Sequence, residues 1–292
     1  MDPSNGIGVQ LDTHITKERF KGRVGIVTGG ASGIGRATVE RFANDGASVH
    51  FFDIDEKNGK ALEASLQEAG HSVTYHNVNV TDKARCDEAV GSIAAENGGE
   101  VHMLFNNAAC FLSKGLEATQ EDWTKSFSVN VVGYSNMVQA CYPYMHKGQG
   151  CAIVNNASGL VHRVQPNRWT YGGTKGAVWS MTRFMALDLS PEGIRVNSIS
   201  PCIVWTPEVA RRFPDRAGAE EYFGKLQLLR RMCEPAEVAA TVAWLCSRDA
   251  SFITAADIPV DGGYLAMSAE GFGDAKLSDR CNKSQGETEE AE

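Results

Sequence analysis

Short runs of apolar and β-branched residues alternate with longer segments of helical composition along most of the chain. The runs are rich in Val, Ile and aromatic residues and are bounded by turn residues, which is typical of β-strands. They are R-V-G-I-V-T (23–28), S-V-H-F-F-D (48–53), S-V-T-Y-H-N-V-N-V (72–80), V-H-M-L-F-N (101–106), C-A-I-V-N-N-A (151–157), I-R-V-N-S-I-S (194–200) and A-D-I-P-V-D (256–261). Between them the pattern predicts helices at 33–46, 57–70, 83–96, 121–146, 171–190 and 235–246.

Strands that alternate with helices form crossover units, which place helices on both faces of a parallel sheet. The pattern therefore predicts an α/β fold with one doubly wound, Rossmann-type domain over residues 23–267 and a seven-stranded parallel sheet. Residues 1–22 lack periodicity and read as an N-terminal arm. Residues 268–292 are rich in Gly, Ser and acidic side chains and read as an acidic, disordered tail.

Composition limits the classes of partner. The chain has 292 residues, 42% of them hydrophobic, which is enough for a large packed core. Its net charge of −8 repels phosphate, so we expect no nucleic-acid partner and no membrane partner.

Cysteine spacing and the absence of long apolar runs indicate the cellular compartment of the protein. The eight cysteines show no C-x-x-C motif, which argues against a metal site or a disulfide framework and favours a reducing environment. The N-terminus lacks a basic region followed by an apolar run, and no stretch approaches the roughly 20 apolar residues of a membrane span. We therefore expect a soluble, cytoplasmic protein without a metal.

A glycine-rich turn, T-G-G-A-S-G-I-G at 28–35, joins the first predicted strand to the first predicted helix. Glycines let a backbone approach a pyrophosphate, which the N–H groups at a helix N-terminus stabilise. In this context the turn predicts a dinucleotide site. Asp53 ends the second strand 18 residues after Gly35, where an acid accepts hydrogen bonds from ribose and repels a 2′-phosphate, so NAD is favoured over NADP. Arg36 lies near the turn, but it could equally be solvated, and Asp53 could be a simple turn residue.

Several ordered motifs over residues 20 to 266 resemble those of the short-chain dehydrogenases/reductases. The glycine turn resembles the family's T-G-x-x-x-G-x-G, and Y-G-G-T-K, beginning at Tyr171, resembles its Y-x-x-x-K. N-N-A-A (106–109), S-V-N (128–130), I-V-N-N-A-S (153–158), R-V-N-S-I-S-P (195–201) and V-D-G-G (260–263) match further family motifs.

The resemblance implies a catalytic tetrad of Asn130, Ser158, Tyr171 and Lys175. Tyr171 would exchange a proton with the substrate oxygen, and Lys175 would favour its phenolate and lower its pKa of about 10. Ser158 would hydrogen-bond the substrate oxygen, while Lys175 would hold the nicotinamide ribose and Asn130 a water. Taken singly, Asn130 and Ser158 could equally be a packing and a turn residue, and any helix brings Tyr171 and Lys175 onto one face.

The resemblance also implies an NAD site and a homo-oligomer. The oligomer would be a dimer or tetramer packed through helices at 121–146 and 171–190. The expected cofactor-binding residues are Gly29, Ser32, Gly33, Ile34, Gly35, Asp53, Ile54, Asn79, Val80, Asn106, Ala108, Tyr171, Lys175, Pro201, Val204 and Thr206.

Three positions depart from the family pattern, because Ala109, Cys202 and Ala255 stand where glycines are usual. The first two should narrow the pocket, and we expect Cys202 to pack rather than act as a nucleophile, since no basic activator accompanies it.

The expected substrate pocket is apolar and aromatic, which suits a hydrophobic secondary alcohol or its ketone. Its residues are Phe111, Leu160, Trp169, Cys202 and Trp205, with a long connection at 205–234 as a lid. Arginines at 211–231 could bind an anionic group or form a solvated face. The I-V-W-T-P stretch and the tail resemble 17β-hydroxysteroid dehydrogenases. A 3-oxoacyl-carrier-type carbonyl reductase and a non-catalytic nucleotide-binding regulator remain as alternatives.

Overall fold

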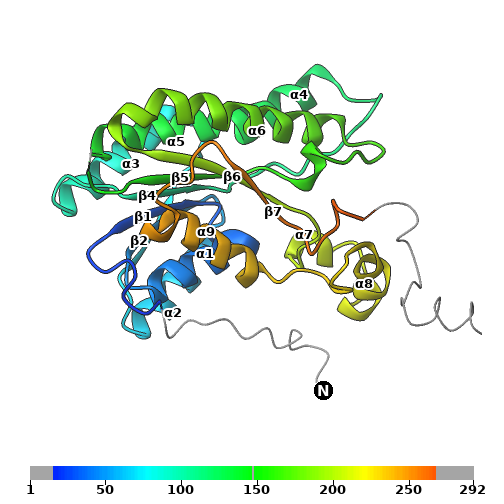
Figure 1. Ribbon diagram of the computed structural model, residues 1–292, viewed down its shortest axis with the longest axis horizontal. Coiled ribbons are helices and arrows are strands. Elements are labelled where there is room, and N and C mark those ends of the chain that lie inside the picture. Colours follow the sequence, from blue (N-terminus) through cyan, green and yellow to red (C-terminus); the bar gives the residue numbers. More distant parts are fainter. Residues whose placement is uncertain (1–15, 147, 268–292) are drawn as a thin grey trace, which may run out of the picture.

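A seven-stranded parallel sheet forms the centre of the computed structural model, which describes residues 16–146 and 148–267 (Figure 1). Its strands are β1 (Val24–Thr28), β2 (Ser48–Asp53), β3 (Val73–Asn77), β4 (Met103–Asn106), β5 (Ala152–Asn156), β6 (Arg195–Pro201) and β7 (Asp257–Val260). They lie in the order β3-β2-β1-β4-β5-β6-β7, so successive strands are added on one side of β1 up to β3 and on its other side from β4 onward. In such sheets ligands bind beyond the carboxyl ends of the strands at this change of side. The predicted doubly wound α/β fold is confirmed.

Helices cover both faces of the sheet (Figure 1). One face carries α3 (Lys83–Glu96), α5 (Gly133–Cys141) and α6 (Trp169–Leu189). The other carries α1 (Gly33–Asn44), α2 (Glu56–Glu68) and α9 (Pro235–Cys246). Each face has its own apolar core, and the central strands are buried throughout because helices cover both sides.

The predicted helix at 121–146 is wrong as a single element. It consists of α4 (Gln120–Phe127), a π-helical turn (Ser128–Val132), α5 and a short 3₁₀ turn (Tyr142–Tyr144). Thr119 starts α4 with a capping box that it shares with Asp122. In the π turn the Gly133 N–H donates to the Ser128 carbonyl, five residues back, and Asn130 lies on this turn. Such turns are frequent at functional sites.

The packed part of the chain begins before Arg23, so part of the predicted arm belongs to the domain. Phe20 is fully buried, and its ring packs edge-on against Phe42 with centroids 5.3 Å apart. The Thr16 hydroxyl donates to Asp45 over 2.8 Å. The rest of the predicted arm and the predicted tail from residue 268 lie outside the described residues.

The connection after β6 forms a small layer at one end of the sheet (Figure 1). It contains α7 (Pro207–Ala210) and α8 (Arg216–Phe223), and we call residues 205–234 the lid. A parallel bridge between Val204 and Cys233 joins the two ends of this segment. Across residues 16–146 and 148–267, none of the helices is both long enough and apolar enough to cross a membrane.

A buried histidine and a half-buried one lie side by side on adjacent strands. Nδ1 of His50 in β2 is 3.1 Å from Nε2 of His76 in β3, and the Asn97 amide lies 3.4 Å from the other His50 ring nitrogen. Burial, reinforced by His76, lowers the pKa of His50 to about 4, and burial also lowers the pKa of His76. Both rings are therefore neutral in the folded protein at pH 7.

We predict that His50 makes the free energy of unfolding fall as the pH is lowered. Its ordinary pKa of 6.5 applies to the unfolded chain, so the unfolded state binds the extra proton as the pH falls from 6.5 to 4. The stabilisation from the neutral ring is complete above pH 6.5, and about 3 kcal/mol of it is lost by pH 4. Urea unfolding between pH 7.5 and 4.5 measures this loss, which His50→Gln should reduce. The exposed His146 is the matched control, and equal pH slopes in His50→Gln, His146→Gln and the wild type would contradict the prediction.

Candidate functional site

The turn after β1 requires glycine at several positions. Gly29 and Gly33 have φ angles of 66° and 54°, in the left-handed region that side chains disfavour. A Cβ at Gly35 would lie 1.9 Å from the Gly29 carbonyl oxygen, and one at Gly29 would lie 2.8 Å from Cα of Ala108. The turn is therefore packed against its own backbone and against the segment after β4.

The helix that follows this turn presents an anion-binding end. Ser32 is the N-cap of α1, but its side chain makes no capping hydrogen bond, so the first N–H groups of α1 have no cap from it. These groups and the helix dipole favour a negative ligand. A Cβ at Gly33 would lie 3.4 Å from Thr206, so the start of the lid lies against the turn.

Asp53 lies beside the same turn at the end of β2. Its Oδ2 accepts a hydrogen bond from the Ala31 N–H over 2.9 Å, and its Oδ1 accepts one from the Asp55 N–H over 3.0 Å. Arg36, the nearby cation, pairs with Glu40 over 2.8 Å within α1. The glycine cradle, the free helix end and this fixed carboxylate together fit a dinucleotide.

The remaining predicted cofactor residues follow the carboxyl ends of the strands, with differences in exposure. Ile54 is 70% exposed beside Asp53, whereas Asn106 at the end of β4 is fully buried and its Oδ1 has no partner in the described structure. Asn79 is exposed, and its Oδ1 accepts hydrogen bonds from the Thr81 N–H and hydroxyl, which turns it toward its own loop. Val80 is buried in the core of one sheet face, which Ala108 also contacts, and Ile34 packs against the core of the other face. Pro201 at the end of β6 and Val204 just after it are buried.

Three elements bring the predicted tetrad together. Ser158 follows β5, and it lies close enough to Tyr171, in the first turn of α6, for its side chain to lower the pKa of that phenol. Lys175 follows one turn later, with Nζ 5.8 Å from the centroid of the Tyr171 ring. Lys175 is 1% exposed, and its Nζ donates to the Asn156 carbonyl over 2.6 Å.

Burial dominates the acid–base properties of this pair. It raises the pKa of Tyr171 to about 12, against the smaller lowering effects of Ser158 and Arg168, and it lowers the pKa of Lys175 to about 7. The expected net lowering of the tyrosine pKa is therefore not seen in the protein without a cofactor, because burial outweighs the groups that lower it. Lys175 is itself desolvated, and its Nζ donates to the Asn156 carbonyl.

The Asn130 side chain links the segment after β4 to α6 by hydrogen bonds. Its Oδ1 accepts from the Cys110 N–H over 2.7 Å, while its Nδ2 donates to the Cys110 carbonyl and to the Thr174 hydroxyl. The side chain thus ties the segment after β4 to α6 beside Lys175. Its predicted role in holding a water stays a prediction.

Sequence reasoning missed three polar residues around the tetrad. Asn107 donates through Nδ2 to the Thr28 and Gly29 carbonyls, and its Oδ1 accepts from Asn156. Tyr134, on α5, lies within 3.3 Å of Lys175 Nζ. The signal for Tyr134 was its position four residues after Asn130, which favours one helix face.

The predicted pocket residues differ in position and exposure, and two of them lie beside tetrad residues. Phe111 stacks on Tyr171 with ring centroids 5.6 Å apart, and Leu160 lies in the turn directly after Ser158. Trp169 starts α6 and is 55% exposed, whereas Trp205 joins the apolar cluster under the lid.

Cys202 packs against the turn after β5. A Cβ at Gly159 would lie 2.1 Å from its Sγ, and burial raises the pKa of the thiol to about 12. A protonated, packed thiol matches the expected structural role. Ala255, another substituted glycine, has a φ of 59°, a conformation that costs a non-glycine residue about 1 kcal/mol.

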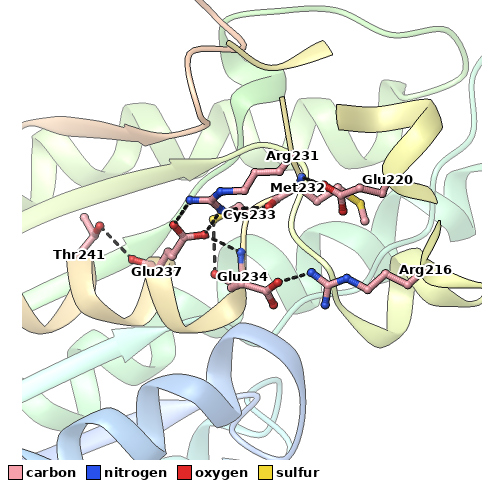
Figure 2. Close-up of polar contacts among 8 residues, drawn as sticks. All are labelled: Arg216, Glu220, Arg231, Met232, Cys233, Glu234, Glu237 and Thr241. Atoms are coloured by element: carbon pink, nitrogen blue, oxygen red, sulfur yellow. Dashed lines mark hydrogen bonds and ion pairs between the residues drawn. The ribbon is translucent and has the colours of Figure 1, made fainter. Parts of the chain in front are cut away.

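Several lid arginines form ion pairs within the protein. These pairs matter for the alternative that the arginines bind an anionic group of the substrate. Arg231 donates two hydrogen bonds to the Glu237 carboxylate, over 2.7 and 2.6 Å, and Arg216 pairs with Glu234 (Figure 2). Glu234 and Glu237 also form the capping box of α9, so the pairs tie the lid to that helix. Arg211 and Arg212 pair with Glu208 in α7. These contacts favour a structural role for the four arginines.

Comparisons with known proteins agree with this geometry. A family model described as enoyl-(acyl carrier protein) reductase matches residues 29–265. The 3-oxoacyl-[acyl-carrier-protein] reductase of Thermotoga maritima is 33% identical over 85% of this chain and 99% of its own length. The cyclopentanol dehydrogenase of Comamonas testosteroni is 34% identical over 85% and 99%. The ligand-free aldohexose dehydrogenase of Thermoplasma acidophilum has a TM-score of 0.77 and 29% identity, covering 86% of this chain and 97% of that one.

We predict that Gly35→Ala weakens binding of a nicotinamide dinucleotide more than tenfold, because the new methyl group would displace the Gly29 carbonyl and with it the turn. Gly176→Ala is the matched control, since its methyl group would meet no atom within 4 Å. Quenching of tryptophan fluorescence by added dinucleotide measures the dissociation constants. Equal constants for Gly35→Ala and Gly176→Ala would show that the turn does not hold the ligand.

Proposed function

Because the chain belongs to the short-chain dehydrogenase/reductase family of oxidoreductases, we propose that it interconverts a hydrophobic secondary alcohol and its ketone with NAD as cofactor. The observation that carries the proposal is the convergence of Ser158, Tyr171 and Lys175 beside the glycine turn. Phe111, stacked on Tyr171, supports an apolar substrate. The name of the cyclopentanol dehydrogenase relative is consistent with an apolar ring.

A nicotinamide bound here supplies the hydride acceptor or donor and, when oxidised, a positive charge. The residues named at the glycine turn, Asp53 and Thr206 would hold the cofactor. Tyr171 takes the proton of the substrate hydroxyl during oxidation and returns it during reduction. Ser158 hydrogen-bonds the same substrate oxygen and stabilises its developing charge. Lys175 supplies the ammonium that favours phenolate in the transition state.

Burial of Tyr171 fits this role. A pKa of about 12 keeps the phenol protonated in the free protein at neutral pH. The proton therefore leaves only when further positive charge and the substrate oxygen reach the site, which couples proton transfer to the assembled complex.

We predict that Tyr171→Phe lowers turnover at least a hundredfold, because it removes the proton-transfer group while keeping the ring that stacks on Phe111. The assay follows NADH formation with cyclopentanol, cyclohexanol and steroid alcohols as probes. Dinucleotide binding should remain within a few fold of the wild type. Full turnover of Tyr171→Phe on any active probe would refute the mechanism.

Asp53 supports NAD over NADP, because its fixed carboxylate would repel a 2′-phosphate. We predict that the wild type favours NAD over NADP by at least a hundredfold in kcat/KM. Asp53→Ser should reduce this ratio at least tenfold. Asp55→Asn removes a neighbouring charge and keeps a capping side chain, so it should leave the ratio close to that of the wild type. A wild-type preference for NADP would contradict the assignment.

A reductase acting on 3-oxoacyl carriers is the second candidate, favoured by the matching family model and by the Thermotoga maritima relative. Its substrate is long and flexible, so oxidation of 3-hydroxyacyl thioesters in the same assay separates it from a dehydrogenase of cyclic alcohols.

We also propose that the chain is a homo-oligomer, a dimer or tetramer, assembled through α4 to α6. Exposed apolar side chains at Phe127, Val132, Phe184 and Leu187 support this assembly. Sedimentation at working concentration tests it.

A further inference from the structure

Lys175 is buried without a counter-ion. Its side chain is 1% exposed, and no carboxylate lies within 4 Å of Nζ in the described parts of the chain. Burial alone is the cause that lowers its pKa. A buried ammonium without a carboxylate persists only if other acceptors satisfy its protons. Its partners therefore decide whether it carries charge.

Two neutral oxygens accept from Nζ. The main-chain carbonyl of Asn156 lies at 2.6 Å, and the hydroxyl of Tyr134 lies at 3.3 Å. The same hydroxyl donates to the Asn156 carbonyl over 3.3 Å. The three groups form a closed triangle of hydrogen bonds. The Tyr134 hydroxyl donates its proton to the carbonyl and accepts a hydrogen bond from the ammonium.

Tyr134 is buried as completely as the lysine that it contacts. It is 1% exposed, and its ring packs with Ala157 and Val178. Burial raises its pKa well above the ordinary value, so it stays a neutral phenol. The centroid of its ring lies 5.4 Å from Nζ, close to the 5.8 Å that separates Nζ from the Tyr171 ring. Nζ thus lies close to the rings of two phenols, Tyr134 and Tyr171.

The helical segment from the π turn into α5 holds two consecutive residues of α6. The Asn130 side chain is fixed by hydrogen bonds to the Thr174 hydroxyl and to the main-chain N–H and carbonyl of Cys110. One helical turn later, Tyr134 contacts Lys175. This segment therefore holds α6 at Thr174 through Asn130 and at Lys175 through the Tyr134 hydroxyl.

We propose that Tyr134 is a positioning residue for the proposed reaction, whose hydroxyl holds the Lys175 ammonium in place and in its charged form between Asn156 and Tyr171. The inference rests on the proposed function, in which the charge on Lys175 favours the Tyr171 phenolate. The hydroxyl moves no proton to substrate; it acts only through the lysine.

Tyr134→Phe tests this role, because it removes the hydroxyl and keeps the packed ring. We expect kcat to fall about five- to twentyfold with the most active alcohol of the probe panel and NAD, with KM for the alcohol within twofold. The pH range of high kcat/KM should narrow by about one unit, because a less charged Lys175 makes Tyr171 harder to deprotonate. Tyr142→Phe, which removes an exposed hydroxyl from the end of the same helical segment, should match the wild type.

A second measurement does not depend on turnover. In protein labelled with ¹³C at lysine Cε, Lys175→Met identifies the Lys175 resonance, and its titration gives the pKa. Tyr134→Phe should move that pKa down by about one unit. An unchanged pKa together with wild-type kcat and pH profile would overturn the inference, even if Tyr171→Phe is inactive and the proposed function stands. A loss seen in Tyr134→Leu but absent from Tyr134→Phe would likewise show a packing residue only.

Discussion

The burial of Lys175 without a carboxylate is the constraint on which the site depends. Taking an ammonium out of water is expensive, and here only neutral oxygens offset the cost. The resulting pKa of about 7 leaves the lysine charge sensitive to small changes around it. A carboxylate partner would fix the charge and also neutralise its effect on Tyr171, so the neutral acceptors suit a lysine whose field must reach the phenol.

The fold supplies these acceptors because different elements end at one place. Strand β5 delivers Asn156 and Ser158, α6 delivers Tyr171 and Lys175, and the π turn aligns Asn130 with Thr174. Between β1 and β4, where the strand order changes sides, the glycine turn lies against Ala108. Ion pairs from Arg216 to Glu234 and from Arg231 to Glu237 hold the lid to α9, the helix packed on α1.

Much of this arrangement could be predicted from sequence, for physical reasons. Alternating apolar runs define buried parallel strands. Gly29 and Gly33 adopt left-handed φ angles that favour glycine, and Gly35 leaves no room for a Cβ. The tetrad was identified from motif resemblance, and the structure brings its members together. Local patterns could not reveal the π turn inside the predicted helix at 121–146, because its apolar positions continue through the turn.

Desolvation was the other property that sequence could not give. The expected lowering of the Tyr171 pKa considered the charges of Lys175 and of an oxidised cofactor, whereas desolvation depends on packing from α5 and the segment after β4. Tyr134 was missed for the same reason, since its contact with Lys175 joins residues 41 positions apart. Long-range packing, rather than motif spacing, sets the acid–base properties of the site.

The most direct test is the pKa of Lys175 in the wild-type protein, measured by titration of its ¹³Cε resonance. The buried, carboxylate-free arrangement predicts a value of about 7. A value near the ordinary 10.5 would show that the ammonium is solvated or paired, and would contradict the central role given to its burial.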